Sequence, residues 1–322
     1  MPGSREGAKA TTARQAADDA TASGGPRTIA ALVVPAAERL VRAGLSPADA
    51  RTDAGVLIRH VLGWDPATWL ARSTEPADAG VASRFEDAVA RRLARVPVSQ
   101  ITGAREFYGR PFVVTADVLT PRPETEIVAE EALRVLGARG ATDAPAGRPP
   151  LLVDAGTGSG CLAVTIALER PDVRVIASDL SDAALAVARR NAAAHGVADR
   201  VLLVRADLIP PTAAPPDLVV SNPPYVPDHD REALAPEVRD HEPPGALFGG
   251  ADGLDVVRAL VAQAATRLAP GGHLVVEIGA GQADEARQAA EAHRLEVLRL
   301  VADLQGIARV LVARRVASDP LL

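Results

Sequence analysis

Apolar residues recur at spacings of three and four over residues 28–95, which is the pattern of helices that bury one face. Two helix starts are indicated where a capping residue precedes a proline, at Ser46-Pro47 and at Asp65-Pro66. We therefore predict a small helical bundle domain over residues 27–96. The preceding residues 1–26 mix Ala, Ser, Thr and Gly with charged residues, so we predict a disordered tail there.

The pattern changes over residues 97–120, where short runs with aromatic side chains replace the helical spacing. Residues 106–109 and 111–114 predict a hairpin or linker between two domains. Most of the aromatic residues lie in segments without the pattern of a regular core: Phe107, Tyr108, Phe112, Tyr225 and Phe248. In a chain with few aromatic residues, this placement indicates a functional site.

Short apolar runs alternate with alanine-rich helical stretches in the rest of the chain. The runs cover residues 151–154, 173–178, 201–204, 217–221, 273–277, 295–301 and 309–312. Such alternation is typical of an open α/β sheet with helices on both faces. We predict that residues 121–322 form this second domain, and that its ligand site lies beyond the carboxyl ends of the strands.

Composition narrows the class of protein. A length of 322 residues, 48% of them hydrophobic, is enough for two domains with substantial cores. The net charge is −6 and Lys9 is the only lysine, and this charge balance argues against a protein that binds long nucleic acid. The single cysteine, Cys161, can form neither an internal disulfide nor a zinc cluster. With no apolar run in residues 1–26 that suits a signal peptide or membrane span, we expect a cytoplasmic protein without membrane or metal.

The first predicted strand ends in a glycine-rich turn, Asp-Ala-Gly-Thr-Gly-Ser-Gly over residues 154–160, where a ligand can approach bare backbone. The dinucleotide-binding fingerprint has glycine or alanine at the place of Cys161. The cysteine therefore disfavours a nicotinamide or flavin enzyme. No Gly-Lys-Ser/Thr sequence follows, so the turn is not a phosphate-binding P-loop. We interpret Cys161 as a small buried residue and not as a nucleophile.

Acidic residues follow three successive predicted strands. Asp154 can oppose positive groups, Asp179 can accept the two hydroxyls of a ribose, and Asp207 can accept the amino group of an adenine. Leu208 can cover a face of that adenine. S-adenosylmethionine carries both a sulfonium and an ammonium, so these positions favour it as cofactor. Each acid alone is also consistent with a helix cap or a loop residue.

The fourth predicted strand runs into Asn222-Pro223-Pro224-Tyr225. The prolines remove backbone donors, which leaves carbonyl oxygens beside the Asn222 amide oxygen as acceptors for a planar NH2 group. An amide or aromatic amine has a delocalised lone pair, so these acceptors would favour the pyramidal nitrogen that forms as it attacks a methyl group. We predict that Asn222, Pro223 and Tyr225 are catalytic, with Tyr225 packed on the flat target group. The alternative is a rigid turn after a strand.

Three further segments accompany this tetrapeptide. They are Gln-Ile-Thr-Gly and Glu-Phe-Tyr-Gly at residues 100–103 and 106–109, Pro-Arg-Pro-Glu-Thr-Glu at residues 121–126, and matches over residues 242–243, 246–247 and 249–254. Together the four segments resemble the HemK/PrmC family, methyltransferases that modify the glutamine of the Gly-Gly-Gln loop in class I peptide chain release factors. The resemblance covers roughly residues 97–312, and the helical domain more loosely.

The resemblance implies a Rossmann-like class I methyltransferase sheet of seven mostly parallel strands and a protein-glutamine N-methyltransferase that modulates translation termination. It implies cofactor contacts at Gly156, Thr157, Gly158, Ser159, Gly160, Asp179, Leu208 and Asn222, to which the strand-end pattern adds Asp207. It implies a substrate pocket formed by Asn222, Pro223, Pro224 and Tyr225 and bordered by Arg122 and Glu124. The helical domain would recognise the rest of the release factor. Two positions depart from the family pattern. Some members have an aromatic ring at the place of Leu208, and an acidic residue is expected at the place of Ala308.

Two other functions remain open at the level of sequence. An amino-methyltransferase of nucleic-acid bases shares the tetrapeptide, but it would need a basic recognition surface, and no stable nucleic-acid binding is expected from this charge balance. A non-catalytic binding module would show a broken cofactor site, whereas Gly156, Gly158, Gly160, Asp179 and Asn222 are all present.

Overall fold

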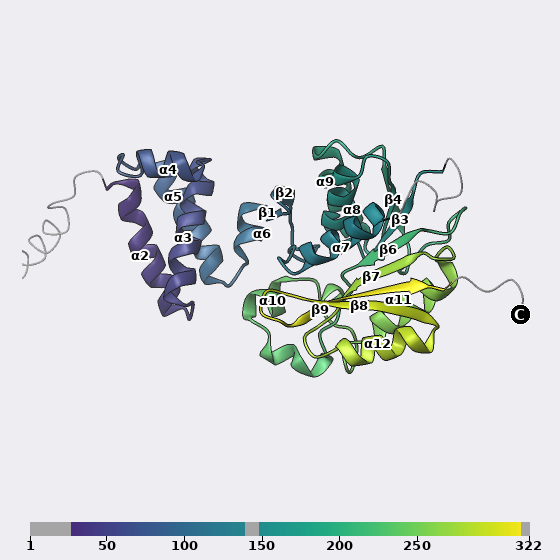
Figure 1. Cartoon of the computed structure of the whole chain (residues 1–322). Helices are drawn as coiled ribbons and strands as arrows, with labels where there is room; N and C mark the ends of the chain where they lie inside the picture. Colours follow the sequence, from purple (N-terminus) through teal and green to yellow (C-terminus); the bar gives the residue numbers. More distant parts are fainter. Residues whose placement is uncertain (1–26, 139–147, 317–322) are drawn as a thin grey trace, which may run out of the picture. The chain divides into compact units, whose positions relative to one another are not determined.

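The computed structural model describes residues 27–138 and 148–316 (Figure 1). The predicted tail, residues 1–26, lies outside this range. Contacts divide the chain into two compact units, one that ends at Thr102 and one that begins at Gly103. This boundary falls within residues 97–120, the segment predicted as a hairpin or linker.

The first unit is a bundle of helices, as predicted. Its helices are α2 (Ile29–Arg42), α3 (Pro47–Leu62), α4 (Pro66–Arg72), α5 (Ala79–Leu93) and α6 (Val98–Thr102). The two predicted helix starts are confirmed: the side chain of Ser46 accepts the Asp49 N–H at 3.1 Å, and that of Asp65 accepts the Thr68 N–H at 2.6 Å. The apolar faces meet in one core that contains Leu40, Leu57, Ile58, Phe85 and Val89.

The second unit begins with an antiparallel hairpin of β1 (Ala104–Phe107) and β2 (Arg110–Val113). Tyr108 and Gly109 both have positive φ, 52° and 71°, as a two-residue hairpin turn requires. The prediction that the aromatic residues gather at a site is wrong for Phe107 and Phe112. Both are fully buried, with ring centroids 6.0 Å apart, in the core beside α8 (Cys161–Glu169). The hairpin therefore anchors this segment to the second unit.

The predicted sheet of seven mostly parallel strands is confirmed. Its strands are β3 (Leu151–Ala155), β4 (Arg174–Asp179), β5 (Val201–Arg205), β6 (Leu218–Ser221), β7 (His273–Glu277), β8 (Leu295–Ala302) and β9 (Ala308–Arg315). They lie in the order β5-β4-β3-β6-β7-β9-β8, and β9 runs antiparallel to both of its neighbours. The order reverses between β3 and β6, and ligands of such sheets bind where the carboxyl ends of those strands separate.

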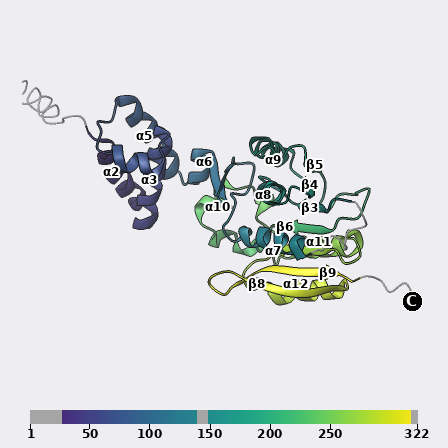
Figure 2. The ribbon, with the colours of Figure 1, turned by 45° about the horizontal axis from the view of Figure 1, so that its top comes forward.

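Helices cover both faces of the sheet (Figures 1 and 2). On one face lie α7 (Thr125–Ala138), α8 and α9 (Asp182–Ala194); on the other lie α11 (Asp255–Arg267) and α12 (Ala283–Ala292). Side chains alternate along β3 accordingly, since Leu152 joins the first core and Val153 the second. Burial on both sides explains why the strands are continuous apolar runs.

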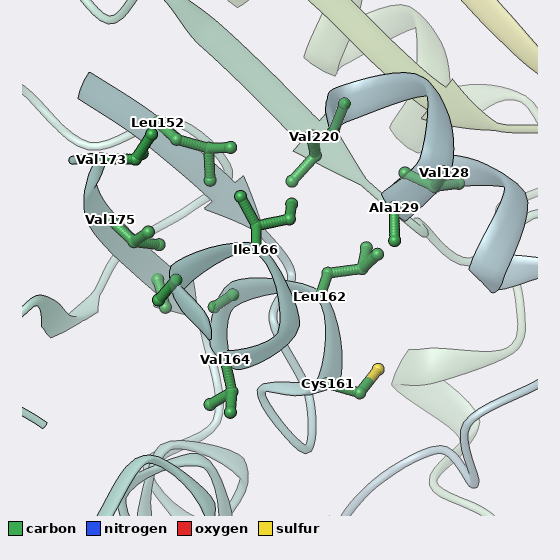
Figure 3. Packing of buried hydrophobic residues seen from close by; sticks show 14 of the residues in the cluster. Val128, Ala129, Leu152, Cys161, Leu162, Val164, Ile166, Val173, Val175 and Val220 are labelled. Carbon is green, nitrogen blue, oxygen red and sulfur yellow. The ribbon is translucent and has the colours of Figure 1, made fainter. Parts of the chain in front are cut away.

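Helix α8 is apolar on every side and packs at the centre of the first core (Figure 3). Leu162 and Ile166, one turn apart, point toward Leu152, Val220 and Ala129. Each such side chain contributes about 1.5–3 kcal/mol on burial, so the start of α8 is fixed firmly beneath the glycine turn. Over residues 27–138 and 148–316, no helix is both long and apolar enough to cross a membrane.

The connection from β6 to α11 is long and crosses the carboxyl ends of the strands. It contains the short helices η1 (Asp228–Ala233), α10 (Pro236–His241) and η2 (Pro244–Ala246). Val226 exchanges backbone hydrogen bonds with Leu247 and Gly249, both 2.9 Å long, which folds the connection back on itself. The four residues after β6 are therefore fixed at one end by the sheet and at the other end by these two hydrogen bonds.

Candidate active site

A cavity of about 330 Å³ opens where the strand order reverses, at the carboxyl ends of β3, β4 and β6. It contains most of the predicted cofactor residues: Gly156, Thr157, Gly158, Ser159, Asp179, Asp207, Leu208 and Asn222. Three carboxylates line it, those of Asp117, Asp179 and Asp207, whereas the described lining includes no lysine, arginine or histidine. Such a lining suits a cationic ligand and disfavours a pyrophosphate.

A larger cavity, of about 550 Å³, lies near His273, at the start of β7 and therefore at the opposite ends of the parallel strands. Its three arginines are all paired, Arg134 and Arg299 with the buried Glu131 and Arg314 with Glu296. Because ligands of open α/β sheets bind at the carboxyl ends of the strands, the smaller cavity is the candidate site.

The glycine turn between β3 and α8 uses its glycines in two ways. Gly156, Gly158 and Gly160 all have left-handed backbones, with φ of 72°, 55° and 80°. A Cβ at Gly156 or Gly158 would meet no atom within 4 Å, so a ligand can reach bare backbone there. A Cβ at Gly160 would lie 3.1 Å from the Ala188 Cβ, so this glycine lets α8 and α9 pack closely and does not line the cavity.

Asp154 does not line the cavity, which corrects the expectation that it opposes a cationic ligand. It is fully buried, and its Oδ2 accepts the Thr157 hydroxyl at 2.6 Å and the Ala163 N–H at 3.1 Å. Burial raises the pKa of this carboxyl to about 7. Asp154 therefore braces the glycine turn and the first turn of α8 from below.

Asp179 ends β4 at the rim of the cavity. Its two oxygens accept the backbone N–H groups of Gly158 and Ser181, both at 2.9 Å. These bonds fix the carboxylate, and each oxygen keeps further acceptor capacity toward the cavity. Asp207 and Leu208 also line it, and Leu208 has a left-handed backbone whose carbonyl accepts the Ser178 hydroxyl at 2.5 Å.

Asn191, on α9, was not anticipated from the sequence. Its side chain is buried and accepts the Val113 N–H at 2.7 Å while it donates to the carbonyls of Val113 and Ser159. The end of the hairpin is thus tied to the glycine turn. A lone asparagine in an alanine-rich helix carries no spacing signal, so only the folded chain reveals this role.

Asn222 follows the end of β6, and the nitrogen and oxygen of its side-chain amide have different surroundings. Its Nδ2 donates to the Thr125 hydroxyl at 2.9 Å, while its Oδ1 is buried without a hydrogen-bond partner in the described structure. A buried acceptor without a donor costs about 1–3 kcal/mol, a cost that a donor from a bound ligand or water would remove. Asn222 lines the cavity, and its oxygen is the side-chain atom that still lacks a hydrogen-bond partner among the described residues.

Thr125 and Glu277 extend this contact into the core. The Thr125 hydroxyl donates to Glu277 Oε2 at 2.7 Å, and the Tyr225 hydroxyl donates to Glu277 Oε1 at 3.1 Å. Burial raises the pKa of Glu277 to about 7, and burial together with Glu277 raises the pKa of Tyr225. Glu277 ends β7, so the strand-end signal that indicated Asp179 also applied to it.

Tyr225 is held in place through its backbone. Its carbonyl accepts the Gln282 Nε2 at 2.9 Å, while Gly253 and Gly249 lie so close that a Cβ would come within 2.2 Å of Tyr225 O and 2.5 Å of Pro224 O, respectively. Pro224 lines the cavity, whereas Pro223 is buried and Tyr225 faces Glu277. The loop over residues 249–254 therefore fixes the predicted catalytic tetrapeptide.

Arg122 and Glu124 lie beside the cavity without lining it. Arg122 pairs with the buried Glu242 at 2.5 Å, which links the segment before α7 to the connection after β6. Burial raises the pKa of Glu242 despite this arginine. Arg122 thus holds the two segments on either side of the cavity together.

We expect Gly253→Ala to lower the free energy of unfolding by about 1–3 kcal/mol, because its Cβ would overlap the Tyr225 carbonyl and its φ of 78° disfavours a side chain. Urea unfolding would measure the loss. Gly137→Ala, where a Cβ meets nothing within 4 Å, is the matched control and should unfold at wild-type urea concentrations or higher. Equal midpoints for both variants would contradict the close approach.

Comparison with protein-family models gives two matches. Residues 32–103 match the PrmC N-terminal domain, and residues 146–238 match the methyltransferase small domain. The second match spans the glycine turn, Asp179 and Asn222. The first covers the helical unit.

Curated relatives align over most of the chain. It is 44% identical over 283 residues to the release factor glutamine methyltransferase of Cereibacter sphaeroides, covering 88% of this chain and 97% of the relative. It is 42% identical over 268 residues to that of Bradyrhizobium diazoefficiens, covering 83% and 89%. It is 44% identical over 286 residues to that of Burkholderia pseudomallei, covering 85% and 94%.

Proposed function

Because the chain belongs to the HemK/PrmC family of release factor glutamine methyltransferases, we propose that it methylates a glutamine side chain of a protein. The substrate is the glutamine of the Gly-Gly-Gln motif in class I peptide chain release factors, and the reaction forms N5-methylglutamine with S-adenosylmethionine as methyl donor. The observation that carries the proposal is the buried, unpaired Oδ1 of Asn222, a residue that lines a cavity whose described lining has no basic side chain.

The residues at the cavity fit S-adenosylmethionine, which supplies an electrophilic methyl group on a sulfonium. Asp179 offers acceptors for the ribose hydroxyls, and Asp207 with Leu208 offers an acceptor and an apolar surface for the adenine. The bare backbone at Gly156 and Gly158 leaves room for the amino-acid portion. Among the described residues, the charged side chains that line the cavity are all carboxylates, which favours a cation.

Asn222 binds the target nitrogen. Its Oδ1 accepts one N–H of the glutamine amide, and the carbonyls of the Pro223-Pro224 segment accept the other. Two acceptors favour a pyramidal nitrogen, whose lone pair is free to attack, over the planar amide of the ground state. Fixing the nitrogen in line with the methyl group supplies up to about 7–11 kcal/mol more.

Tyr225 packs against the flat amide. Its hydroxyl stays protonated and donates a hydrogen bond to Glu277. No strong base is needed before attack, because the amide N–H becomes acidic only once the nitrogen carries the methyl group. The proton then leaves to water.

The remaining assignments concern recognition. The helical unit contacts the release factor outside its Gly-Gly-Gln loop, consistent with the match of residues 32–103 to the PrmC N-terminal domain. Arg122 and Glu124 border the entry of the glutamine. The protein acts in the cytoplasm, and it does not form stable complexes with nucleic acid, in keeping with a net charge of −6.

The test supplies labelled S-adenosylmethionine and the purified protein with three acceptors: a class I release factor, the same factor with its Gly-Gly-Gln glutamine changed to alanine, and bulk RNA. We expect label on the intact factor alone. Label on RNA would transfer the function to a base amino-methyltransferase. Failure to bind the cofactor in calorimetry, with no label anywhere, would favour a non-catalytic binding module.

A further inference from the structure

Four side chains from three separate segments of the sequence form one hydrogen-bonded chain behind the cavity. Asn222 Nδ2 donates to Thr125 Oγ1 at 2.9 Å, Thr125 Oγ1 donates to Glu277 Oε2 at 2.7 Å, and Tyr225 Oη donates to Glu277 Oε1 at 3.1 Å. Thr125 is 2% exposed and Glu277 is 1% exposed, so water does not compete for these bonds. The segment that begins α7, the end of β7 and the turn after β6 each contribute to it.

The direction of these bonds is dictated by Glu277. An ionised carboxylate can only accept hydrogen bonds, so the single hydroxyl proton of Thr125 must be donated to Glu277. The Thr125 oxygen is then an acceptor toward Asn222, which must present its NH2. The Asn222 oxygen is consequently left without a donor among the described residues, and Asn222 is one of the residues that line the cavity.

We propose that Glu277, acting through Thr125, is a positioning residue that orients the Asn222 amide with its oxygen toward the target nitrogen, an inference that rests on the proposed function. A reversed amide would present its NH2 to the N–H groups of the substrate and would repel them. Asn222 carries no charge that could choose between the two orientations. The ionised carboxylate of Glu277 therefore fixes the orientation of the amide.

Protonation of Glu277 removes this constraint. A protonated carboxyl can donate to Thr125, whose hydroxyl is then free to donate to the Asn222 oxygen and reverse the amide. The groups that act on Glu277 are the Thr125 and Tyr225 hydroxyls, the carboxylate of Glu124 and the guanidinium of Arg309. Burial outweighs the two hydroxyls and Arg309 and raises the pKa of Glu277 to about 7. The active, ionised form is therefore lost as the pH falls through about 7.

The experiment compares Thr125→Val, Thr125→Ser and the control Thr165→Val in the release-factor assay at saturating S-adenosylmethionine. Thr125→Val removes the hydroxyl at nearly constant volume, and we expect kcat to fall about 10- to 100-fold, with the dissociation constant of the cofactor unchanged. Thr125→Ser restores the hydroxyl and should restore most of kcat. Thr165 is equally buried in α8 and its hydroxyl has no hydrogen-bond partner in the described structure, so Thr165→Val should leave kcat unchanged.

The pH profile separates positioning from packing. For the wild type and Thr125→Ser, kcat should rise with pH through about 7 and level off above it, because the active carboxylate is the ionised one. This limb should disappear in Thr125→Val, in which Glu277 no longer reaches Asn222. It should also disappear in Glu277→Gln, which does not titrate and provides a second variant if Thr125→Val does not fold.

A kcat for Thr125→Val equal to that of Thr165→Val, or an acidic limb that persists in both Thr125→Val and Glu277→Gln, would overturn the proposal. Inactivity of the wild type toward the release factor would instead overturn the proposed function, so the two failures are distinguishable.

Discussion

Replacing Asn222 with alanine is expected to lower kcat by about 10³-fold, the range seen when one preorganised group at a reacting centre is removed. The variant loses the acceptor that we propose for the attacking nitrogen, and it removes the group that donates to the Thr125 hydroxyl oxygen. We expect the dissociation constant of S-adenosylmethionine to rise less than about fivefold, or by about 1 kcal/mol. Single-turnover transfer to the release factor measures kcat, and calorimetry measures binding.

The other asparagine of the chain provides the matched control. Asn191 joins Val113 to Ser159 and does not line the cavity, so Asn191→Ala should lower the free energy of unfolding and weaken cofactor binding, with kcat at saturation near the wild-type value. Wild-type turnover in Asn222→Ala would remove Asn222 from the mechanism. A kcat loss of similar size in both variants would indicate general disruption.

Replacing Asp179 with alanine is expected to raise the dissociation constant of S-adenosylmethionine by about 10²-fold or more, because two hydrogen bonds to a charged acceptor are worth about 3 kcal/mol or more together. The carboxylate is already oriented by Gly158 and Ser181, so we expect it to bind the ribose without an ordering cost. Calorimetry on the free protein gives the constant directly, and kcat at saturating cofactor should change much less.

Asp182→Ala tests whether the effect depends on position. Asp182 lies three residues farther along, 70% exposed in an ion pair with Arg205 on the surface, and such pairs contribute little to stability. Its removal should leave the dissociation constant unchanged. If Asp179→Ala and Asp182→Ala bind the cofactor equally well, the ribose does not lie at the end of β4.

Much of the fold follows from local sequence pattern. All seven predicted strands are present, with ends that differ by at most three residues, because apolar runs of four to eight residues between helical stretches have few alternatives. The starts of α3 and α4 follow from a capping side chain and a proline, which act within one turn. Asp179, Leu208 and Asn222 were predictable for a related reason: in a parallel sheet, the residues after successive strands meet at one edge.

The errors arose where burial decides the role of a side chain. Phe107 and Phe112 were assigned to a site, but the hairpin turns their rings into the core beside α8. Asp154 follows the strand-end pattern and yet lies beneath the glycine turn, fully buried, where it braces backbone and hydroxyl groups. Sequence spacing places a residue near an edge of the sheet but does not give the direction of its side chain.

The helical unit, the seven-stranded sheet, the edge predicted to bind the ligand and the tetrapeptide after β6 could all be predicted from local pattern, because each depends on contacts within a few residues or on strand order. The folded chain was needed to tell the acids that line the cavity from the one that braces it, and to bring Thr125, Asn222, Tyr225 and Glu277 together. These four residues are separated by up to 152 positions along the chain. Their hydrogen bonds exist because packing of α7 against the sheet excludes water from a carboxylate, and no local pattern specifies that packing.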